Sequence, residues 1–476
     1  MSSYAISPTL NKNRVFILQK SEMETRLDPF YYVPELIELE KKVLAKKPKK
    51  LRDYVKGIAS GATPKIAESE KYYAEKENGI PFLRVQNLSL TSVLEYDDCK
   101  YINEETHNGM LKRSQVSAGD LLVKITGVGR MAVASIAPED FEGNINQHVC
   151  VIKTESKEIS ETIAAFLNSD IGEQLASRRS TGGTRPALDY PALLSIPILD
   201  DKRVLEITKN VVEQKKQNEA EAEKLLSSID DYLLGQLEIV LPKENENTLE
   251  SRLFTSTLKK ISANRFDPFF YQSKFIANIS AVKNGKYPVK PLRKVIEGNL
   301  IKGTLPKQEE KEGNNPVVQI SCINSDGTIS LDDILTAKDI FSQEQKLKIE
   351  DLLVVITGAT IGKIAQWNYE GSYFLGGDIV KFQINSLANN SFVYHFLRSA
   401  PMQIEIKRNI TGATNGHLSP EDIKQLIIPI PPIEKQKEIA EHITSIRQQA
   451  QQLKDKTKAV LTNASKEIEI ILLGNV

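Results

Sequence analysis

The clearest hydrophobic pattern in the chain lies near its end. From Ile439 onward, apolar or small residues recur at alternating intervals of four and three positions, with Lys, Glu, Gln and Asp between them. This is the heptad spacing of a coiled-coil seam. A helix of about 35 residues spans about 50 Å, which is longer than a globular domain needs for its own core. The narrow seam therefore favours a second helix as its partner.

A second long helix, with a more polar version of this seam, is predicted between Val204 and Leu234, where Lys215 and Asn218 occupy seam positions. Two such helices in one chain can pair and bury both seams, and antiparallel pairing would put one globular part at each end. The alternative is that each helix packs on its own domain. The predicted seam residues are Val204, Val211, Leu225, Ile229, Ile439, Ile443, Ile446, Leu453 and Val460.

Ahead of each long helix the pattern changes to short apolar runs bounded by Gly, Asp or Asn, which are typical of buried strands. Ile80–Val85 and Leu121–Thr126 are two such runs in the first half. Pro316–Ile320 and Leu352–Thr357 are their counterparts in the second half. Each half is therefore predicted to contain a sheet of its own.

Helical stretches follow these strands at Ser160–Arg179 and Ser391–Asn409. Each ends just before a Thr-Gly-x-Thr loop, where glycine permits the left-handed backbone that terminates a helix. After each loop, an Ile-Pro-Ile segment is predicted to be extended, because proline disfavours helix in the residue before it.

The two halves share these motifs in the same order. The repeated pairs are RLDPFYY at 26–32 and RFDPFFY at 265–271, DLLVKITG at 120–127 and DLLVVITG at 351–358, and TGGT at 181–184 and TGAT at 411–414. A period of roughly 240 residues is far too long for a solenoid and indicates two domain-sized copies. The predicted segments are a first domain at 14–200, its long helix at 201–237, a second domain at 252–431 and its long helix at 432–473.

Length and composition agree with two globular domains. The chain has 476 residues, of which 40% are hydrophobic and 26% charged, as is ordinary for a globular protein. Its 62 basic and 62 acidic side chains cancel, so binding to nucleic acid would need a local basic patch. The sequence contains no long apolar run, and Met1–Asn13 lacks the apolar stretch of a signal peptide. We therefore expect a cytoplasmic protein with no membrane association.

Candidate catalytic motifs are weak. Gly358–Lys363 has one residue too few between its glycines for a phosphate loop, and Ile364 stands where Ser or Thr should hold magnesium. Asp28–Tyr31 is similar to the Asp-Pro-Pro-Tyr tetrapeptide of amino-methyltransferases, but it has one proline and no glycine-rich cofactor loop upstream. The five histidines do not fall at ligand spacing. We expect no catalytic residue, metal site or cofactor on this chain.

Local features favour nucleic acid as the ligand. Eight basic residues lie between Lys41 and Lys56, with Asp53 as the one acid among them. Basic side chains also flank both Thr-Gly-x-Thr loops, Arg185 among them. Arg, Asn, Gln and Thr on glycine-bounded loops suit contacts with both phosphates and base edges. A solvated charged surface is the alternative explanation for a lone basic run.

This ordered set of motifs, copied twice over nearly the whole chain, resembles the DNA-specificity subunit of type I restriction–modification systems. The resemblance lies in the Arg-x-Asp-Pro-aromatic opening, the Asp-Leu-Leu-Val strand, the Thr-Gly-x-Thr loop and the Ile-Pro-Ile exit before a long helix. The first copy departs from the pattern at its exit, where Leu199-Asp200-Asp201 replaces the double proline of the second copy.

The resemblance implies an α+β fold with two tandem α/β target-recognition domains, joined by two long helices that form an antiparallel coiled coil. Each domain would read one half of a split double-stranded DNA target. The helices would set the spacing and dock two methyltransferase subunits, with a motor–nuclease subunit where restriction accompanies modification. S-adenosylmethionine and ATP would be bound by those partners only, and the chain would be a non-catalytic reader. The rivals are a coiled-coil scaffold without a DNA role and a self-contained DNA adenine methyltransferase.

The residues expected to contact DNA are chosen from loop chemistry. In the first half they are Lys65, Arg84, Gln86, Asn87, Arg130, Arg178, Arg179, Thr181, Thr184 and Arg185. In the second half they are Lys307, Gln319, Asn324, Lys363, Lys407, Arg408, Thr411, Thr414 and Asn415. The loops differ between copies, with Arg185 against Asn415 and Arg130 against Lys363, which predicts that the two half-sites differ in sequence.

Overall fold

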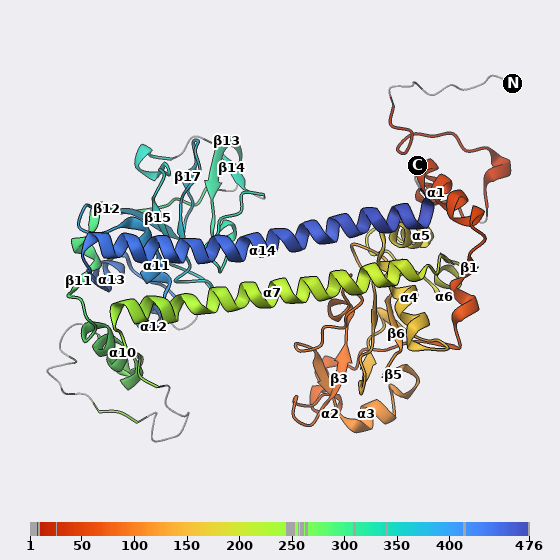
Figure 1. Ribbon diagram of the computed structural model, residues 1–476, viewed down its shortest axis with the longest axis horizontal. Helices are drawn as coiled ribbons and strands as arrows, with labels where there is room; N and C mark the ends of the chain where they lie inside the picture. The colour runs from red at the N-terminus through yellow and green to blue at the C-terminus, as the bar shows by residue number, and fades with distance from the viewer. Residues whose placement is uncertain are drawn as a thin grey trace. The chain divides into compact units, whose positions relative to one another are not determined.

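The computed structural model describes residue 7 and residues 10–24, 26–243, 253–255, 257, 261, 265–307, 311–332, 334–338, 341–412 and 416–474. The chain forms two compact units, the first from residues 1–219 and 454–476 and the second from residues 220–453. The predicted long helices correspond to α7 (Lys202–Leu237) and α14 (Ile433–Leu473) (Figure 1). Each unit therefore contains part of both long helices, which differs from the predicted division into domains followed by separate helices.

Two four-stranded sheets form the globular part of the first unit. The first sheet is antiparallel, in the order β2 (Gly57–Ser60), β9 (Val149–Lys153), β6 (Leu121–Lys124) and β7 (Ala134–Ile136). The second has the order β4 (Lys100–Ile102), β3 (Ile80–Leu83), β8 (Glu142–Ile145) and β5 (Gln115–Ser117). In it, β3 and β8 are parallel. A short antiparallel pair joins β1 (Lys49–Lys50) to β10 (Pro197–Ile198).

Before α7, the helices of the first unit are α1 (Pro34–Ala45), α2 (Ser69–Tyr72), α3 (Glu104–Asn108), α4 (Lys157–Asn168), α5 (Asp170–Arg179) and α6 (Tyr190–Leu194). Of these, α4 packs against β6 and β7 of the first sheet. The helix predicted at 160–179 is thus two helices. Ser169 separates them, because its hydroxyl accepts the Gly172 N–H and so caps α5 in an extended conformation. A Cβ on Gly172 would lie 2.1 Å from the Phe166 oxygen, so this tight connection requires glycine.

The second unit repeats this arrangement. Its main sheet has the order β12 (Ile296–Lys302), β18 (Ile379–Ile384), β15 (Leu352–Val355) and β16 (Ile364–Gln366). A second sheet has the order β14 (Leu335–Ala337), β13 (Lys311–Val318) and β17 (Phe374–Leu375). A short pair joins β11 (Val289–Pro291) and β19 (Ile427–Pro429). Its helices are α10 (Ser273–Lys283), α11 (Asn390–Arg398), α12 (Ala400–Asn409) and α13 (Pro420–Gln425).

The repeat in sequence is therefore a repeat of fold. The parallel pair β3 and β8 corresponds to β13 and β17, and all four predicted strands are confirmed. Two further matching segments are GATPK at 61–65 and GTLPK at 303–307, and the glycine of each lies where two backbones meet. A Cβ would stand 1.6 Å from the Ile145 oxygen at Gly61, and 1.8 Å from the Gly376 oxygen at Gly303. No side chain fits there, which explains why both copies have glycine.

The segments of α7 and α14 run antiparallel. In the first unit, Asn218 donates from Nδ2 to Thr457 Oγ1 at 3.1 Å. In the second unit, the rings of Tyr232 and His442 lie 4.1 Å apart between centroids. Within the first unit, Val204 near the start of α7 shares a core with Ile468 and Leu472 near the end of α14, as antiparallel helices require. The helices also contribute to the core of each unit. Ile468 of α14 belongs to the hydrophobic core of the first unit, and Ile439 of α14 belongs to the hydrophobic core of the second unit.

The predicted seam residues divide by burial. The buried ones are Val204, Ile229, Ile439, Ile443 and Ile446. The half-buried ones are Val211, Leu225, Leu453 and Val460. Among the residues that the structure describes, none of the helices combines the length and apolar character needed to cross a membrane.

Candidate nucleic-acid interface

An open hollow of about 240 Å³ lies in the first unit, where the ends of several strands meet the loop that contains Thr-Gly-Gly-Thr. Its polar lining residues are Arg84, Gln86, Lys124, Thr126, Asn146, His148 and Arg185. The structure thus brings together three of the predicted DNA-contacting residues, Arg84, Gln86 and Arg185. The other four were not predicted from the sequence.

These side chains are positioned by strand ends and by one adjoining loop. Arg84 follows β3 and precedes the short 3-10 helix η5 (Val85–Asn87). Lys124 is the last residue of β6, and His148 immediately precedes β9. Arg185 lies in the loop whose base is closed by two backbone hydrogen bonds of 2.8 Å between Thr181 and Ala187. Side chains from distant parts of the chain therefore converge at one end of the first sheet.

His148 is a neutral hydrogen-bond acceptor in this arrangement. Arg185 Nη2 lies 2.9 Å from His148 Nε2. A guanidinium has donors only, so Nε2 must accept and the ring proton must be on Nδ1. Burial, and then the charge of Arg185, hold the pKa of His148 below its usual value, which favours the same neutral form.

Lys124 brings a positive charge to the inner wall of the hollow. Its side chain is nearly buried, and Nζ donates to the Val128 oxygen at 2.7 Å. Burial lowers the pKa of Lys124 because the charged form is partly removed from water. The sequence did contain a signal for this residue: Lys124 is the one mismatch between DLLVKITG and DLLVVITG, where the second copy has Val355.

The hollow is rich in hydrogen-bond donors. Among the described residues that line it, none has a carboxylate, whereas Arg84, Lys124 and Arg185 are cationic. Arg84 Nε is buried and makes no hydrogen bond with any described residue. An unsatisfied buried donor is costly, so the site is suited to a ligand that presents acceptors.

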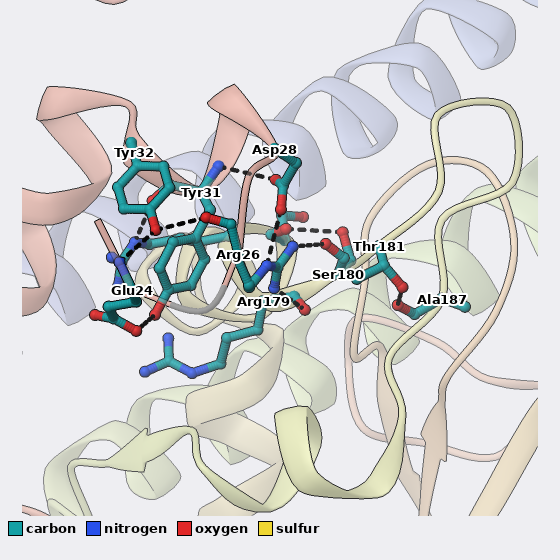
Figure 2. Close-up of polar contacts among 11 residues, drawn as sticks. Glu24, Arg26, Asp28, Tyr31, Tyr32, Arg179, Ser180, Thr181 and Ala187 are labelled. Atoms are coloured by element: carbon teal, nitrogen blue, oxygen red, sulfur yellow. Dashed lines mark hydrogen bonds and ion pairs between the residues drawn. The ribbon is translucent and has the colours of Figure 1, made fainter. Parts of the chain in front are cut away.

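The opening RLDPFYY motif holds the loop beside the hollow. Arg26 donates from Nε to Asp28 at 2.8 Å, and from Nη1 and Nη2 to the Arg179 and Ser180 oxygens at 2.8 and 2.7 Å (Figure 2). Asp28 also accepts the Tyr31 backbone N–H at 3.2 Å. The groups that a methyltransferase would turn toward a base are therefore used as an anchor for residues 179–181.

The second unit contains the same anchor. Arg265 donates to Asp267 at 2.8 Å, and to the Asn409 and Ile410 oxygens at 3.2 and 3.5 Å. Thr411 and His417 close the loop base, with backbone hydrogen bonds of 2.9 and 2.7 Å. The repeated motif is thus explained by a structural role common to both copies.

Arg178, Arg179 and Asn87, which were predicted to contact DNA, are buried and bonded within the first unit. Arg178 and Arg179 are 6% and 8% exposed and both pair with Glu40 of α1. Asn87 is 3% exposed: its Oδ1 accepts the Arg84 backbone N–H at 2.8 Å, and its Nδ2 donates to the Glu95 oxygen at 2.8 Å. These three side chains stabilise the scaffold, and loop chemistry alone could not reveal their buried partners.

Arg130 is also engaged within the first unit. It donates to Asp170 at 2.6 Å and to the Asn168 oxygen at 2.9 Å. The predicted equivalence of Arg130 with Lys363 is wrong, because Lys363 corresponds to Val133. The Val133 oxygen accepts the N–H of Lys124, which ends β6, and the Lys363 oxygen accepts the N–H of Val355, which ends β15. Lys363 donates from Nζ to the Ile323 oxygen at 3.0 Å.

The remaining predicted residues are mostly exposed. The exposed ones are Lys65, Thr181, Thr184, Lys307, Asn324, Lys407 and Thr411, and Gln319 is half-buried. Lys65 pairs with Glu68 at 3.7 Å. Asn324 donates to Thr328 Oγ1 at 2.9 Å. Arg408 is half-buried, donates to the Phe270 oxygen at 2.9 Å and lies 3.7 Å from the Phe270 ring centroid. It resembles the scaffold arginines more than a free contact residue. Thr414 and Asn415 lie outside the described residues.

Comparison with known proteins identifies the second half most directly. Residues 283–463 match the family model described as the type I restriction modification DNA specificity domain. The specificity subunit of the type I restriction enzyme EcoKI from Escherichia coli (strain K12) is 25% identical over 168 residues, 34% of this chain and 35% of that protein. The StySPI specificity subunit from Salmonella potsdam is 23% identical over 170 residues, 34% of this chain and 36% of that protein. The match therefore spans about a third of each curated relative.

A solved structure is similar over more of the chain. The crystal structure of the type I restriction-modification system S subunit from M. genitalium has a TM-score of 0.42 and 13% identity, covering 90% of this chain and 94% of that one. The resemblance found in the sequence is confirmed: residues 283–463 match the type I restriction modification DNA specificity domain, and the chain is similar to specificity subunits of type I systems.

Proposed function

We propose that the chain is the DNA-reading subunit of a type I restriction–modification complex. Each unit reads one half of a split target, and the antiparallel helices set the number of bases between the halves. The observation that carries this proposal is the donor-rich hollow of Arg84, Lys124 and Arg185 beside a rigidly anchored loop. Such a group of cations without a carboxylate suits the acceptors of phosphates and base edges.

In this proposal the chain reads DNA and does not itself modify it. Arg26 and the Tyr31 backbone N–H engage Asp28, the residue that best matched a methyltransferase motif. Among the described residues, no group of three or more His, Cys, Asp or Glu is arranged to hold a metal ion. In this proposal S-adenosylmethionine and ATP belong to partner subunits, and this chain supplies position and sequence selectivity.

Two partner methyltransferases are proposed because the two units offer equivalent apolar surfaces. Leu27 and Phe266 occupy the same place in the opening motif and are 79% and 84% exposed. Phe30 and Phe269, three residues later, are 52% and 38% exposed. Large apolar side chains exposed at matching positions suit an interface better than solvent. One partner copy on each unit follows from the repeat.

The test is a tagged pull-down from the native host, followed by native mass spectrometry and methylome sequencing. We expect an adenine methyltransferase at two copies per chain and methylation of a split target. A complex with Leu27→Ser should lose one partner copy, and a complex with Leu27→Ser and Phe266→Ser should lose both. The exposed Leu461→Ser is the control and should leave the stoichiometry unchanged.

The rival functions give different results. A scaffold without a DNA role would bind its partners regardless of DNA, whereas a reader that contacts phosphates should lose DNA affinity steeply as salt rises. A self-contained methyltransferase would bind S-adenosylmethionine stoichiometrically as the purified chain. Either result would contradict the proposed function.

A further inference from the structure

The hollow in the first unit has a counterpart position in the second unit with different chemistry. Gln319 follows β13 as Arg84 follows β3, and Val355 ends β15 as Lys124 ends β6. Asp378 corresponds to His148, because their oxygens accept the matching N–H groups of Ile356 and Ile125, both at 2.9 Å. Two cations and a histidine are thus replaced by an amide, an alkyl group and a carboxylate.

This divergence contrasts with the anchors, which both units keep. Contacts with phosphates serve any sequence, so they are needed equally in both halves, whereas contacts with base edges carry the sequence information. Arg26 and Arg265 bind the same backbone positions in their units. The groups that differ at equivalent strand ends are therefore the ones suited to reading bases.

The donors of the first hollow match one base. In the major groove guanine presents two adjacent acceptors, N7 and O6, while adenine and cytosine each present an amino donor. Arg84 and Arg185 have guanidinium groups that can donate in pairs, and Lys124 adds a third cation behind them. No described lining residue has a carboxylate, so the side-chain oxygens that an amino group of adenine or cytosine could meet are the neutral ones of Gln86, Thr126 and Asn146.

Resting on the proposed function, we propose that this hollow reads a guanine in the half-site of the first unit, and that the equivalent place in the second unit does not. Arg84 and Arg185 are the specificity-determining residues. His148 is a positioning residue, because it accepts from Arg185 at 2.9 Å and so limits where the guanidinium can point. Gln319 suits adenine, whose N7 and N6 pair with an amide.

The test uses the chain assembled with its methyltransferase partners and a randomised duplex library, with bound sequences counted. The wild-type complex should select a split target with an invariant G·C pair in one half. Arg84→Gln and Arg185→Asn install the residues of the second copy, Gln319 and Asn415. Each should reduce the preference for guanine at one position by about 5- to 150-fold and leave the other half-site unchanged.

Arg203→Asn is the matched control. Arg203 is exposed on α7 and pairs with Asp201 at 2.7 Å. Its substitution removes one positive charge from the first unit, as Arg84→Gln and Arg185→Asn do. It should leave base preference intact. His148→Ala should reduce guanine preference less than Arg185→Asn, and His148→Gln, which restores an acceptor, should recover it.

Three results would overturn the inference. In the first, the half-site affected by the substitutions has no invariant G·C pair. In the second, the arginine variants weaken binding equally on all sequences. In the third, both arginine variants keep the wild-type base preference. The second result would mark the hollow as a phosphate site. No sequence-selective binding by the wild-type complex would contradict the proposed function itself, and the inference with it.

Discussion

Both units hold an arginine against the aromatic ring at the same position of the opening motif, but the carboxylate that neutralises the arginine comes from different places. Arg178 lies 4.1 Å from the Tyr31 ring centroid and Arg408 lies 3.7 Å from that of Phe270. In the first unit the carboxylate comes from Glu40 on α1, which pairs with both Arg178 and Arg179. In the second it comes from Glu405, one turn earlier on the same helix as Arg408, at 3.2 Å. The stacking was kept in both copies while the compensating charge changed its origin.

The interactions that occur in both units are the ones that define the fold. The backbone contacts of Arg26 and Arg265 recur, and so do the loop closures at Thr181 and Thr411. Charge compensation and the lining of the hollow are free to vary around them. Repeated contacts can therefore be assigned to the scaffold, and divergent ones to selectivity or to local compensation.

The largest effect should follow from removing the charge that serves two arginines. Glu40→Gln removes the carboxylate that pairs with both Arg178 and Arg179, which are each under 10% exposed. Breaking a buried ion pair on one side costs about 3–5 kcal/mol. Hydrogen exchange on the full chain should report this loss in α1 and α5 of the first unit only. Glu405→Gln should cost less, since burial already raises the pKa of Glu405 and its Oε2 makes no hydrogen bond with a described residue. Equal losses would contradict the comparison.

The anchor arginines should rank next. Arg26→Lys removes the forked donation to the Arg179 and Ser180 oxygens, and hydrogen bonds from charged groups are each worth about 1.5–3 kcal/mol. Arg265→Lys should cost less, because its bonds to the Asn409 and Ile410 oxygens are 3.2 and 3.5 Å long, against 2.8 and 2.7 Å in the first unit. Faster amide exchange at Thr181 than at Thr411 would be the signature. A larger effect in the second unit would show that these lengths do not reflect strength.

Acid should destabilise the second unit through a buried histidine. His395 of α11 is buried, and burial together with the charges of Arg447 and Arg398 lowers its pKa to about 3. The unfolded chain binds a proton below about pH 6.5 and the folded chain does not, so stability is present above that pH and lost as pH falls toward 3. Each pH unit in this window costs about 1.4 kcal/mol. The first unit has Ala165 at this place.

Urea unfolding between pH 7 and pH 4.5, compared between wild type and His395→Asn, isolates this contribution from other titrations. The variant should lose the acid-dependent difference, and Thr444→Val, which removes the hydroxyl 3.3 Å from His395 Nε2, should keep it. The same pH slope in wild type and His395→Asn would mean that another group controls acid sensitivity.

The smallest effect concerns the polar pair between the long helices. Asn218 and Thr457 meet in the first unit at 3.1 Å, whereas the second unit has the Tyr232–His442 ring contact. A double-mutant cycle with Asn218→Ala and Thr457→Val should give a coupling of about 1 kcal/mol, as for one partly buried hydrogen bond. The same cycle with Tyr232→Leu and His442→Leu should give about 0.5–1.5 kcal/mol. Zero coupling in both would contradict packing between the helices in these units.

The sequence predicted what is repeated and local. The DLLV strands and both long helices could be predicted because each depends on a pattern that occurs twice. The break at Ser169 was missed because a single capping serine interrupts an otherwise continuous helical pattern; in the second half, Pro401 at the start of α12 was an available signal.

What is long-range could not be predicted in this way. Arg178 and Glu40 are 138 positions apart, since 178 minus 40 is 138, and no local pattern connects them. Lys124 and His148 line the same hollow as Arg84 only because three strands end at one place. Of the residues chosen by loop chemistry, Arg84, Gln86 and Arg185 line one hollow, but loop chemistry could not separate them from the buried Arg178, Arg179 and Asn87.

The most direct test of the account is sequence selection by the complete complex on randomised duplex DNA, with wild type and Arg185→Asn compared in parallel. The account predicts a split target, with one half-site altered by the substitution and the other half-site and the spacing unchanged. A wild-type complex that selects no split target, or a substitution that alters both half-sites alike, would contradict the claim that the two units read DNA independently.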